Sequence, residues 1–177
     1  GLASHRGSML GGFPGIDQPR QKYFETLLSA QVKKLDLSRP IFLEAESNKI
    51  GKINIPAELF KKMHRSKCIV IENTLANRSK FLVSRYTNVF KDEVVVERFF
   101  KFLTSRHQPS IAKKARHLYG SRCWKELASH LLDNHYDPSY ERSMSLKDRE
   151  ILSHVKSTDD IEISAHDLAR DILSKYG

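Results

Sequence analysis

Short apolar runs in the first half of the chain predict β-strands. Ile41 to Leu43 form a run too short for a helix, and such a run predicts a strand buried on both faces. Residues 50–55 alternate apolar and polar side chains and predict a second short strand, after which Pro56 suits the first turn of a helix. Residues 67–72 predict a third strand, which is again buried.

Apolar residues spaced three or four positions apart predict helices between these strands. One amphipathic helix covers about residues 20–35 and lies on one face of the sheet, and another runs from about Leu75 to Phe90. Because strands and helices alternate with short connections, we expect a parallel sheet of the α/β class. This α/β domain is expected to occupy residues 1–92.

Only the helical period continues from residue 93 onward, where strands are expected to stop. Apolar stripes predict three helices, at about 96–103, 111–120 and 124–132, with Ser121 as the cap of the third. Residues 93–177 are therefore expected to form a helical subdomain.

Three segments near the C-terminus carry weaker patterns. Residues 135–140, HYDPSY, predict a turn made rigid by Pro138. Residues 145–155 and 164–176 each begin with a Ser that is followed three positions later by Asp, as in a capping box, and predict two short helices. Residues 161–163 lie between them and predict a closing strand.

Positive charge is concentrated before residue 126. The 177 residues carry 30 Lys and Arg against 21 Asp and Glu, a formal net charge of +9. Residues 1–125 hold 24 of these basic and 10 of these acidic residues, a net charge of +14, whereas residues 126–177 hold 6 and 11, a net charge of −5. A basic body of this kind suits a polyanion, and nucleic acid is the commonest one. A soluble protein that is merely basic is the alternative.

Composition excludes several classes of protein. The chain is 40% hydrophobic, enough for a core, yet no run of 18 apolar residues occurs, so we expect no membrane span. Cys68 and Cys123 are too few and too far apart for a disulfide framework or a cysteine-rich zinc site. His154 and His166 lack partners at metal-ligand spacing, and no secretory leader is recognised. A cytoplasmic protein without a resident metal is therefore expected.

Two glutamates follow the first predicted strand. The carboxyl ends of parallel strands face the ligand crevice, so Glu44 and Glu46 are candidates to hold a metal or to orient a polar substrate. Alternation along an extended chain puts both on one side, where a cation such as Arg6 or Lys49 must separate them. Mg²⁺ shared with a diphosphate is an alternative cation, and simple salt bridges with Lys49 and Lys52 are the competing interpretation.

Two other sets of residues are candidates for binding anions. His5, Arg6 and Ser8 lie in a glycine-rich loop, where glycine lets backbone N–H groups approach a phosphate. Arg78 and Arg85 are seven residues apart on one predicted helix and lie on nearly the same face. Two guanidinium groups in register match the oxygens of a diphosphate or of the RNA backbone, although a solvated basic face explains the spacing equally well.

A further basic cluster lies in the predicted helical subdomain. It consists of Arg106, Lys113, Lys114 and Arg116, with Tyr119 and Trp124 near it as rings for base stacking. For Trp124, a place in the core is the expected role.

The segment RPIFLEAESNKIGKINIPAELFKKM, residues 39–63, resembles the middle of the P-loop half of tRNA 2-selenouridine synthases. That family has a strand, an acidic Glu-x-Glu-Ser-Arg motif, and then Ile-Gly and a Leu-Pro or Ile-Pro pair before a helix that ends in Met. Here Asn48 replaces the Arg of the motif, and Lys49 follows as a source of positive charge. Further blocks agree in the same order, so the resemblance spans residues 2 to about 140: 2–12 with 18–25, 77–86, and 131–140.

The resemblance implies a P-loop NTPase-like parallel sheet whose phosphate loop lies upstream of His5. No G-x-x-x-x-G-K-[ST] motif occurs in the chain, so its sheet is expected to be incomplete, without the first strand and the phosphate loop. We therefore expect a fragment, or one half of a split enzyme, that works with an upstream rhodanese and phosphate-loop segment or a separate subunit. The reactive cysteine of the family belongs to the rhodanese domain, and neither cysteine of this chain matches its loop.

The resemblance also implies an activity. Family members convert wobble 2-thiouridine in tRNA to 2-selenouridine through an S-geranylated intermediate, with geranyl diphosphate and selenophosphate as co-substrates. For this chain it implies part of such a transferase, inactive on its own. A tRNA-binding module without chemistry is one alternative. A kinase-like phosphotransferase is another, because a buried strand that ends in Glu resembles a Walker B strand.

The expected site residues fall into three groups, without a metal site of their own. Glu44 and Glu46 are expected to be catalytic. Phosphorylated co-substrates are expected to bind at His5, Arg6, Ser8, Lys49, Arg78 and Arg85. The tRNA is expected to bind at Arg106, Lys113, Lys114 and Arg116 and, because the family has a Tyr-Asp-Pro-x-Tyr block there, at Tyr136 and Tyr140.

Overall fold

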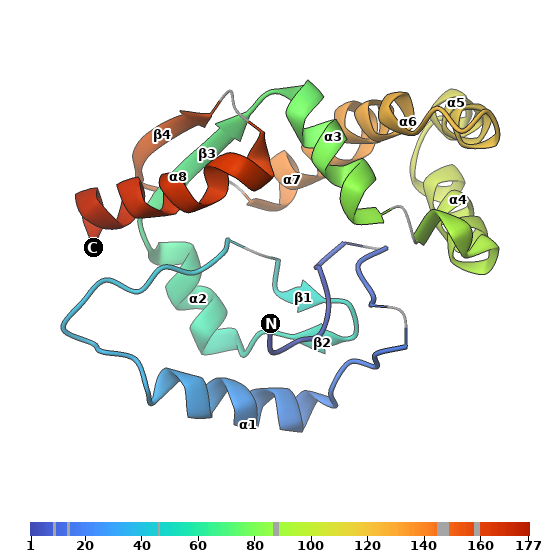
Figure 1. The fold of residues 1–177 in the computed structure, drawn as a ribbon. Coiled ribbons are helices and arrows are strands. Elements are labelled where there is room, and N and C mark those ends of the chain that lie inside the picture. The colour runs from blue at the N-terminus through green and yellow to red at the C-terminus, as the bar shows by residue number, and fades with distance from the viewer. Residues whose placement is uncertain (9, 14, 46, 87–88, 145–148, 158–159) are drawn as a thin grey trace.

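The computed structural model describes residues 1–177 apart from 9, 14, 46, 87–88, 145–148 and 158–159 (Figure 1). Its α-helices are α1 (Gln21–Val32), α2 (Ala57–Arg65), α3 (Leu75–Tyr86), α4 (Glu93–Arg106), α5 (Pro109–Gly120), α6 (Trp124–Leu131), α7 (Asp137–Met144) and α8 (Ile161–Tyr176). Its strands are β1 (Lys49–Ile50), β2 (Ile53–Asn54), β3 (Cys68–Asn73) and β4 (Ile151–Ser157). A 3₁₀ turn, η1, covers Val89–Lys91, and a π-helical segment, η2, covers Leu132–Tyr136.

The N-terminal part packs α1 and α2 around a small hairpin (Figure 1, lower half). β1 and β2 are antiparallel, with Ile50 opposite Ile53, and Gly51 begins the two-residue turn at a φ of +61°. A type II′ hairpin turn needs a positive φ at this position, which glycine adopts without strain. Ile53 is buried in one cluster with Phe24 of α1, so the hairpin lies at the core of this part.

Gln18 ties the N-terminal loop to the hairpin. Its amide nitrogen donates to the carbonyls of Ala3 at 3.1 Å and of Ile50 at 3.0 Å. Its amide oxygen accepts from the Lys52 N–H at 2.8 Å. A Cβ on Gly51 would lie 2.2 Å from the Gln18 oxygen, so a larger residue there would break this link.

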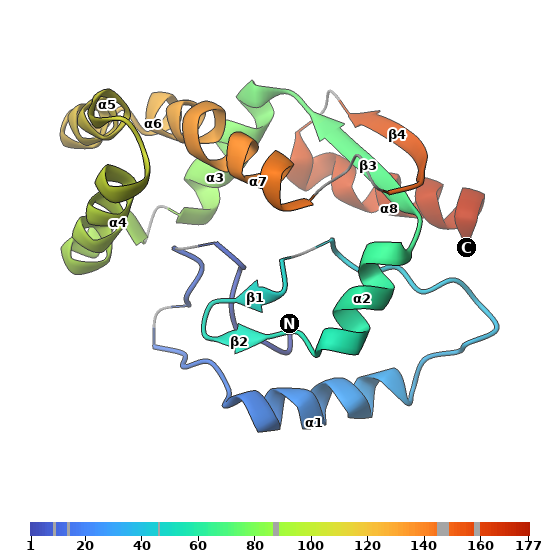
Figure 2. The same ribbon diagram turned by 180° about the vertical axis from the view of Figure 1, so that it is seen from behind.

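The second sheet joins distant parts of the chain. β3 and β4 run parallel, and α8 crosses one face of the pair in both views (Figures 1 and 2). Across the strands, a carboxylate oxygen of Glu72 lies 2.7 Å from His154 Nδ1. Parallel neighbours require a long crossover connection, and the helices from α3 to α7 provide it.

The start of α8 is fastened to α3 by an exposed ion pair. Lys80 Nζ lies 2.6 Å from Asp160 Oδ2, and Asp160 also caps α8 by accepting from the Glu162 N–H at 3.0 Å. The hydrogen bond from Lys80, followed by this backbone N–H, lowers the pKa of the Asp160 carboxyl. Because the folded-state pKa lies below the unfolded one, the contribution to stability is present above the unfolded pKa. It is lost as the pH falls through the folded pKa.

Asp160→Asn is therefore expected to remove part of the stability loss on acidification below about pH 4. The free energy of unfolding, measured by urea titration at several acidic pH values, should fall less steeply in the variant than in the wild type. Lys80→Gln removes the main cause of the lowered pKa and should flatten the same range. Identical pH profiles for all three proteins would show that this pair does not stabilise the fold.

The helical part holds the larger hydrophobic core. α4 packs on α5 and α5 on α6, and Leu103 of α4 is fully buried among them. α3 lies against α6, where the hydroxyls of Ser79 and Ser129 are 2.8 Å apart. The buried residues of this core are Leu10, Val89, Val96, Phe99, Phe100, Leu103, Ala112, Ala115, Leu127 and Leu131.

The segment η2 joins α6 to α7 without interrupting the helix. Its hydrogen bonds span five residues instead of four, and Pro138 follows as the second residue of α7. Proline has no N–H to donate, so a change of hydrogen-bond register just before it accommodates the missing donor. The predicted rigid turn over 135–140 is therefore wrong, because the chain stays helical across Pro138.

The coarse fold prediction is confirmed. The chain is mixed α/β, with a small parallel sheet and a helical part. The helices α1 to α6 and strand β3 lie where apolar periodicity predicts them, apart from small shifts of their ends. The P-loop NTPase-like sheet, its missing first strand, and the division into 1–92 and 93–177 stay predictions.

The strand predicted at Ile41 to Leu43 is wrong. In the described part of the chain this segment pairs with no strand, and its three side chains are between 42% and 58% exposed. An apolar run becomes a doubly buried strand only where neighbouring strands bond to its edges. The strand predicted over 50–55 is instead the β1–β2 hairpin, which turns at Gly51 and Lys52.

Two predictions near the C-terminus are also wrong. Residues 151–157 form β4 where a helix over 145–155 is predicted, and residues 145–148 lie outside the described residues. The spacing of Ile151, Leu152 and Val155 fits a helix as well as a strand, and pairing with β3 decides for the strand. Strands therefore do not stop at residue 93.

The other two corrections concern helix ends. Residues 161–163 form the first turn of α8 instead of a closing strand, because the Asp160 side chain caps the helix there. Ser121 ends α5 instead of starting α6, whose N-cap is Cys123.

Candidate functional site

The N-terminal loop folds back on itself around His5. The Arg6 N–H donates to the Gly11 carbonyl at 2.8 Å, and the Gly7 N–H donates to His5 Nδ1 at 3.0 Å. Burial, and after it the charge of Arg6, lowers the pKa of His5. The imidazole is therefore neutral near pH 7, with Nδ1 as an acceptor and Nε2–H as a donor.

The same loop docks on the end of α3 through Arg6 and Ser8. The Arg6 guanidinium lies 4.3 Å from the ring centre of Phe13 and 5.5 Å from that of Tyr86. The hydroxyls of Ser8 and Tyr86 are 2.7 Å apart. These contacts hold two of the predicted anion-binding side chains in place.

Glu44 meets this loop at a pocket of about 270 Å³. His5, Arg6 and Glu44 all line the pocket, which we call the Glu44 pocket; its other lining residues are Gly1, Leu2, Ala3, Gly7, Phe24 and Ile50. Residues predicted from two separate stretches of the sequence thus surround one cavity. A guanidinium, an imidazole and a carboxylate together suit a phosphorylated ligand and its counter-ion.

The remaining members of this predicted group are less closely placed. Glu46 lies outside the described residues, and Lys49 is exposed on β1. In the described part of the chain no ion pair joins Glu44 to Lys49 or Lys52. Pairing with these two lysines is therefore not the role of the Glu44 carboxylate in this structure.

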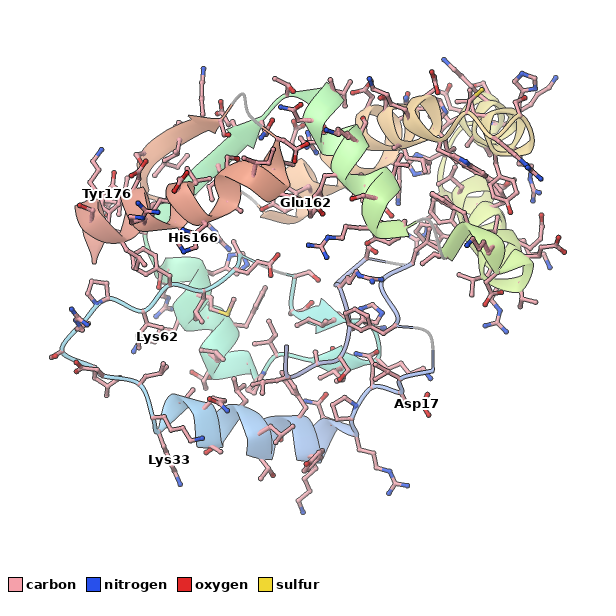
Figure 3. All side chains as sticks on the ribbon, viewed as in Figure 1. Asp17, Lys33, Lys62, Glu162, His166 and Tyr176 are labelled. Atoms are coloured by element: carbon pink, nitrogen blue, oxygen red, sulfur yellow. The ribbon has the colours of Figure 1, made fainter. Side chains whose placement is uncertain are left out.

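Different carboxylates bind the two arginines of α3. Arg78 makes a bidentate ion pair with Asp137 of α7, with Nη1 3.0 Å from Oδ2 and Nη2 2.5 Å from Oδ1. Arg85 Nε lies 3.7 Å from Glu162, which Figure 3 labels at the start of α8. Neither arginine lines the Glu44 pocket, and a diphosphate between them would have to displace both carboxylates.

Asp137→Asn is expected to lower the free energy of unfolding by about 1–2 kcal/mol, because it removes the charged partner of a half-buried guanidinium. Chemical denaturation at neutral pH measures this difference. Asp167→Asn is the matched control, since Asp167 pairs with Arg170 on the exposed surface of α8. The control should change stability by less than about 0.5 kcal/mol. Equal losses in both variants would contradict a structural role for the Arg78 pair.

The basic residues predicted to bind tRNA lie on α4 and α5. Lys113 and Lys114 are exposed and form no ion pair in the described part of the chain. Arg116 lies over the Phe100 ring at 4.6 Å and pairs with Glu97 at 2.7 Å. Residues 93–125, which we call the basic segment, carry two Glu and eight basic residues: Arg98, Lys101, Arg106, Lys113, Lys114, Arg116, Arg122 and Lys125.

The aromatic residues near this segment differ in exposure. Tyr136 packs against the helical core, where burial raises the pKa of its hydroxyl and the nearby Tyr86 adds to the rise. Trp124 stacks on Phe90 with ring centres 5.2 Å apart, which agrees with the core role expected for it. Tyr140 is 52% exposed and is therefore the better placed of the two predicted tyrosines for contact with RNA.

Sequence reasoning missed a pair of histidines between α4 and η2. His107 Nε2 and His135 Nδ1 are 2.8 Å apart, and His135 is buried beside the rings of Phe99 and Phe102. A hydrogen bond between two imidazoles requires one of them to be a neutral acceptor. The two residues are far apart in the sequence, so no local motif signals the pair.

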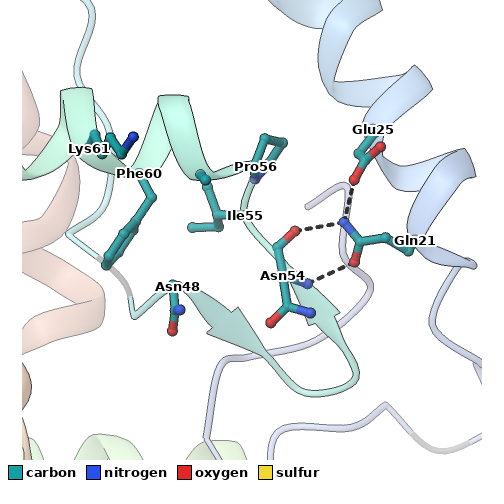
Figure 4. Close-up of a pocket in the computed structure, with 9 residues that line it drawn as sticks. Gln21, Glu25, Asn48, Asn54, Ile55, Pro56, Phe60 and Lys61 are labelled. Carbon is teal, nitrogen blue, oxygen red and sulfur yellow. Dashed lines mark hydrogen bonds between the residues drawn. The ribbon is translucent and has the colours of Figure 1, made fainter.

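A second pocket beside the hairpin was also missed (Figure 4). It has a volume of about 510 Å³ and lies between α1, the hairpin and α2. Its lining residues are Gln21, Glu25, Asn48, Asn54, Ile55, Pro56, Ala57, Phe60 and Lys61. The signal in the sequence is a pair of asparagines that flank the hairpin, Asn48 just before β1 and Asn54 at the end of β2.

Two kinds of site are not found among the described residues. No group of three or more His, Cys, Asp or Glu within them is arranged to hold a metal ion. No helix within them is long and apolar enough to cross a bilayer. The expected lack of a resident metal stays a prediction.

Comparison with known proteins finds one family. The family model described as tRNA 2-selenouridine synthase AAA domain matches residues 1–123. A tRNA 2-selenouridine synthase of Nitrosomonas europaea is 35% identical over 53% of this chain and 23% of the relative. One of Alcanivorax borkumensis is 38% identical over 49% and 24%, and one of Marinobacter nauticus is 28% identical over 86% and 49%.

The chain spans less than half the length of these relatives. No solved structure matches it. The matched residues 1–123 include the Glu44 pocket, the hairpin and nearly all of the basic segment.

Proposed function

The chain belongs to the tRNA 2-selenouridine synthase AAA domain family, and from this premise we propose that it is part of a tRNA-modifying enzyme. This enzyme converts wobble 2-thiouridine in tRNA to 2-selenouridine through a geranylated intermediate. Geranyl diphosphate and selenophosphate are its co-substrates. The chain binds the tRNA and the phosphorylated ends of these co-substrates.

The Glu44 pocket is the observation that supports this proposal most. Both co-substrates are phosphorylated anions, and the pocket is lined by Arg6 and His5, whose side chains carry N–H donors for such anions. When the sulfur of 2-thiouridine bonds to the geranyl carbon, the bond to diphosphate breaks and the leaving group gains negative charge. Arg6 and His5 stabilise that charge.

Glu44 acts on the diphosphate side of the reaction. A carboxylate repels the RNA backbone, so contact with tRNA is not its role. One or two carboxylates together with phosphate oxygens form the ligand set that Mg²⁺ prefers. Where Mg²⁺ accompanies the diphosphate, Glu44 is the residue of the pocket that would hold it.

We expect the rest of the enzyme to come from an upstream segment or a separate subunit, which supplies the phosphate loop and the rhodanese cysteine. The tRNA lies on the basic segment, where Lys113 and Lys114 are exposed. Because these lysines form no ion pair among the described residues, they contact phosphates without first breaking an internal bond.

A tRNA-binding module without chemistry is the second candidate. The basic segment favours this candidate, because none of its residues lines the Glu44 pocket. RNA binding by the basic segment therefore does not need that pocket. A kinase-like phosphotransferase has less support. The strand expected to end at Glu44 is not formed in the described structure, and the carboxylate of Glu72 on β3 lies 2.7 Å from His154 Nδ1.

Nucleoside analysis tests the proposal. Transfer RNA carrying 2-thiouridine is incubated with the chain and its upstream segment or subunit, first with geranyl diphosphate and then with selenophosphate. Mass spectrometry of the digested tRNA should detect the geranylated nucleoside after the first step and 2-selenouridine after the second. Transfer RNA that binds but stays unmodified would support the binding module instead.

A further inference from the structure

The pocket beside the hairpin has no role in the function proposed above. Its volume of about 510 Å³ lies within the range of about 300–1,000 Å³ that is typical of small-ligand sites. Figure 4 shows Phe60 of α2 and Asn48 and Asn54 of the hairpin around it, with Gln21 and Glu25 on the side of α1. An aromatic ring and several amides thus surround one space.

Hydrogen bonds fix the backbone of the pocket wall. The Gln21 side chain donates to the Asn54 carbonyl at 2.9 Å and accepts from the Asn54 N–H at 2.8 Å, as a neighbouring strand would. The Gln21 amide also donates to Glu25 at 2.6 Å. The Ile55 N–H donates to the Asn48 carbonyl at 2.8 Å. The wall is therefore built without using the side-chain amides of the two asparagines.

These two amides have no hydrogen-bond partner in the described part of the chain. Each carries two N–H donors and one acceptor oxygen. This combination complements the edge of a nucleobase, on which donors and acceptors lie side by side. Phe60 lines the same pocket and supplies a ring on which an unstacked base can stack.

We propose that this pocket receives one unstacked base of an RNA, stacked on Phe60 and hydrogen-bonded to Asn48 and Asn54. The inference rests on the proposed function, which makes RNA the substrate. A free nucleotide fits less well, because Lys61 is the one cation among the described lining residues and is paired with Glu58 at 2.8 Å. An RNA is held by phosphate contacts elsewhere and needs only its base here.

The test uses anticodon stem-loop RNAs with an abasic site at each loop position in turn. Fluorescence anisotropy measures the binding of each RNA to the full chain at one low salt concentration. Base stacking on an aromatic side chain is worth a factor of about 5 to 150. One abasic position should therefore weaken binding to the wild type by about fivefold or more.

Phe60→Leu should bind the intact stem-loop about fivefold or more weakly than the wild type, with no further loss at that abasic position. Leucine keeps an apolar side chain at this place. Asn54→Ala leaves the backbone contacts to Gln21 in place. It should also reduce the difference in affinity between the intact and the abasic stem-loop. Tyr23→Ala is the matched control, because Tyr23 is 59% exposed and does not line the pocket. Tyr23→Ala should show the same difference in affinity between the intact and the abasic stem-loop as the wild type does.

Equal binding of every abasic RNA to the wild type would overturn the base-pocket inference and leave the proposed function standing. An unchanged difference in affinity between the intact and the abasic RNA in both Phe60→Leu and Asn54→Ala would also overturn it. Uridine 5′-monophosphate that binds as tightly as the stem-loop would show a free-nucleotide site instead. Failure of every RNA to bind at low salt would overturn the proposed function together with the inference.

Discussion

In the complete enzyme proposed above, Glu44→Gln is expected to abolish the conversion of 2-thiouridine in tRNA, with a loss of rate of about 100-fold or more. The substitution keeps the shape of the side chain and removes its charge from the pocket shared with His5 and Arg6. A neutral amide is a poor ligand for a cation that bridges to a diphosphate. Affinity for tRNA should stay within about twofold of the wild type, because a carboxylate repels the RNA backbone and contributes nothing to binding it.

Two measurements on the same samples separate these effects. Nucleoside mass spectrometry gives the rate of conversion, and anisotropy gives the affinity for tRNA. Glu58→Gln is the matched control, since Glu58 is exposed on α2 and pairs with Lys61 outside the Glu44 pocket. If the Glu44→Gln variant converts 2-thiouridine at the wild-type rate, the catalytic role of this carboxylate is contradicted and its role is structural.

Replacing Lys113 and Lys114 together by Ala is expected to weaken tRNA binding by about 30-fold near 0.15 M salt, if each lysine neutralises about one phosphate. Each replacement should also reduce the salt slope of the affinity by about one. Both side chains are exposed and unpaired among the described residues, so the helical core stays intact. Anisotropy titration against tRNA at several salt concentrations measures both quantities.

Replacing Lys33 and Lys34 by Ala is the control for net charge. These two lysines follow α1, where Figure 3 labels Lys33, and the double variant loses the same total charge from a different part of the molecule. Its affinity for tRNA should fall by less than about threefold, since only long-range attraction is reduced. A similar loss in both double variants would mean that tRNA senses the net charge and not the basic segment.

Elements with local signals were predictable from the sequence. The helix α4 repeats Val96, Phe99, Phe100 and Leu103 at helical spacing, and all four are buried in the structure. Helix periodicity needs no knowledge of distant contacts, because one face of the helix must meet the core wherever that core lies. The run around Ile69 predicts β3 in the same way.

Elements that depend on distant partners were not predictable. β4 is a strand because it pairs with β3, and its own pattern around Ile151 and Val155 also fits a helix. Ile41 to Leu43 show the opposite case, an apolar run that finds no partner strand among the described residues. The π-helical segment before Pro138 was missed for a different, local reason, since composition alone does not reveal a change of hydrogen-bond register.

The candidate site was predictable only in part. His5, Arg6 and Glu44 were selected for their chemistry, and the fold brings them to one pocket. Phe60 and Asn54 carry no chemical signal in the sequence, because a phenylalanine on an amphipathic helix and an asparagine in a hairpin are ordinary. Their common pocket becomes visible only when α2 and the hairpin are placed together.

We expect this chain to bind tRNA through its basic surface. The most direct test is to titrate the chain with tRNA at several salt concentrations between about 0.05 and 0.5 M. The logarithm of the affinity is plotted against the logarithm of the salt concentration. We predict a straight line that falls with a slope of about −3 or steeper, because contact with at least three phosphates releases their counterions. An affinity that does not change with salt would contradict the claim.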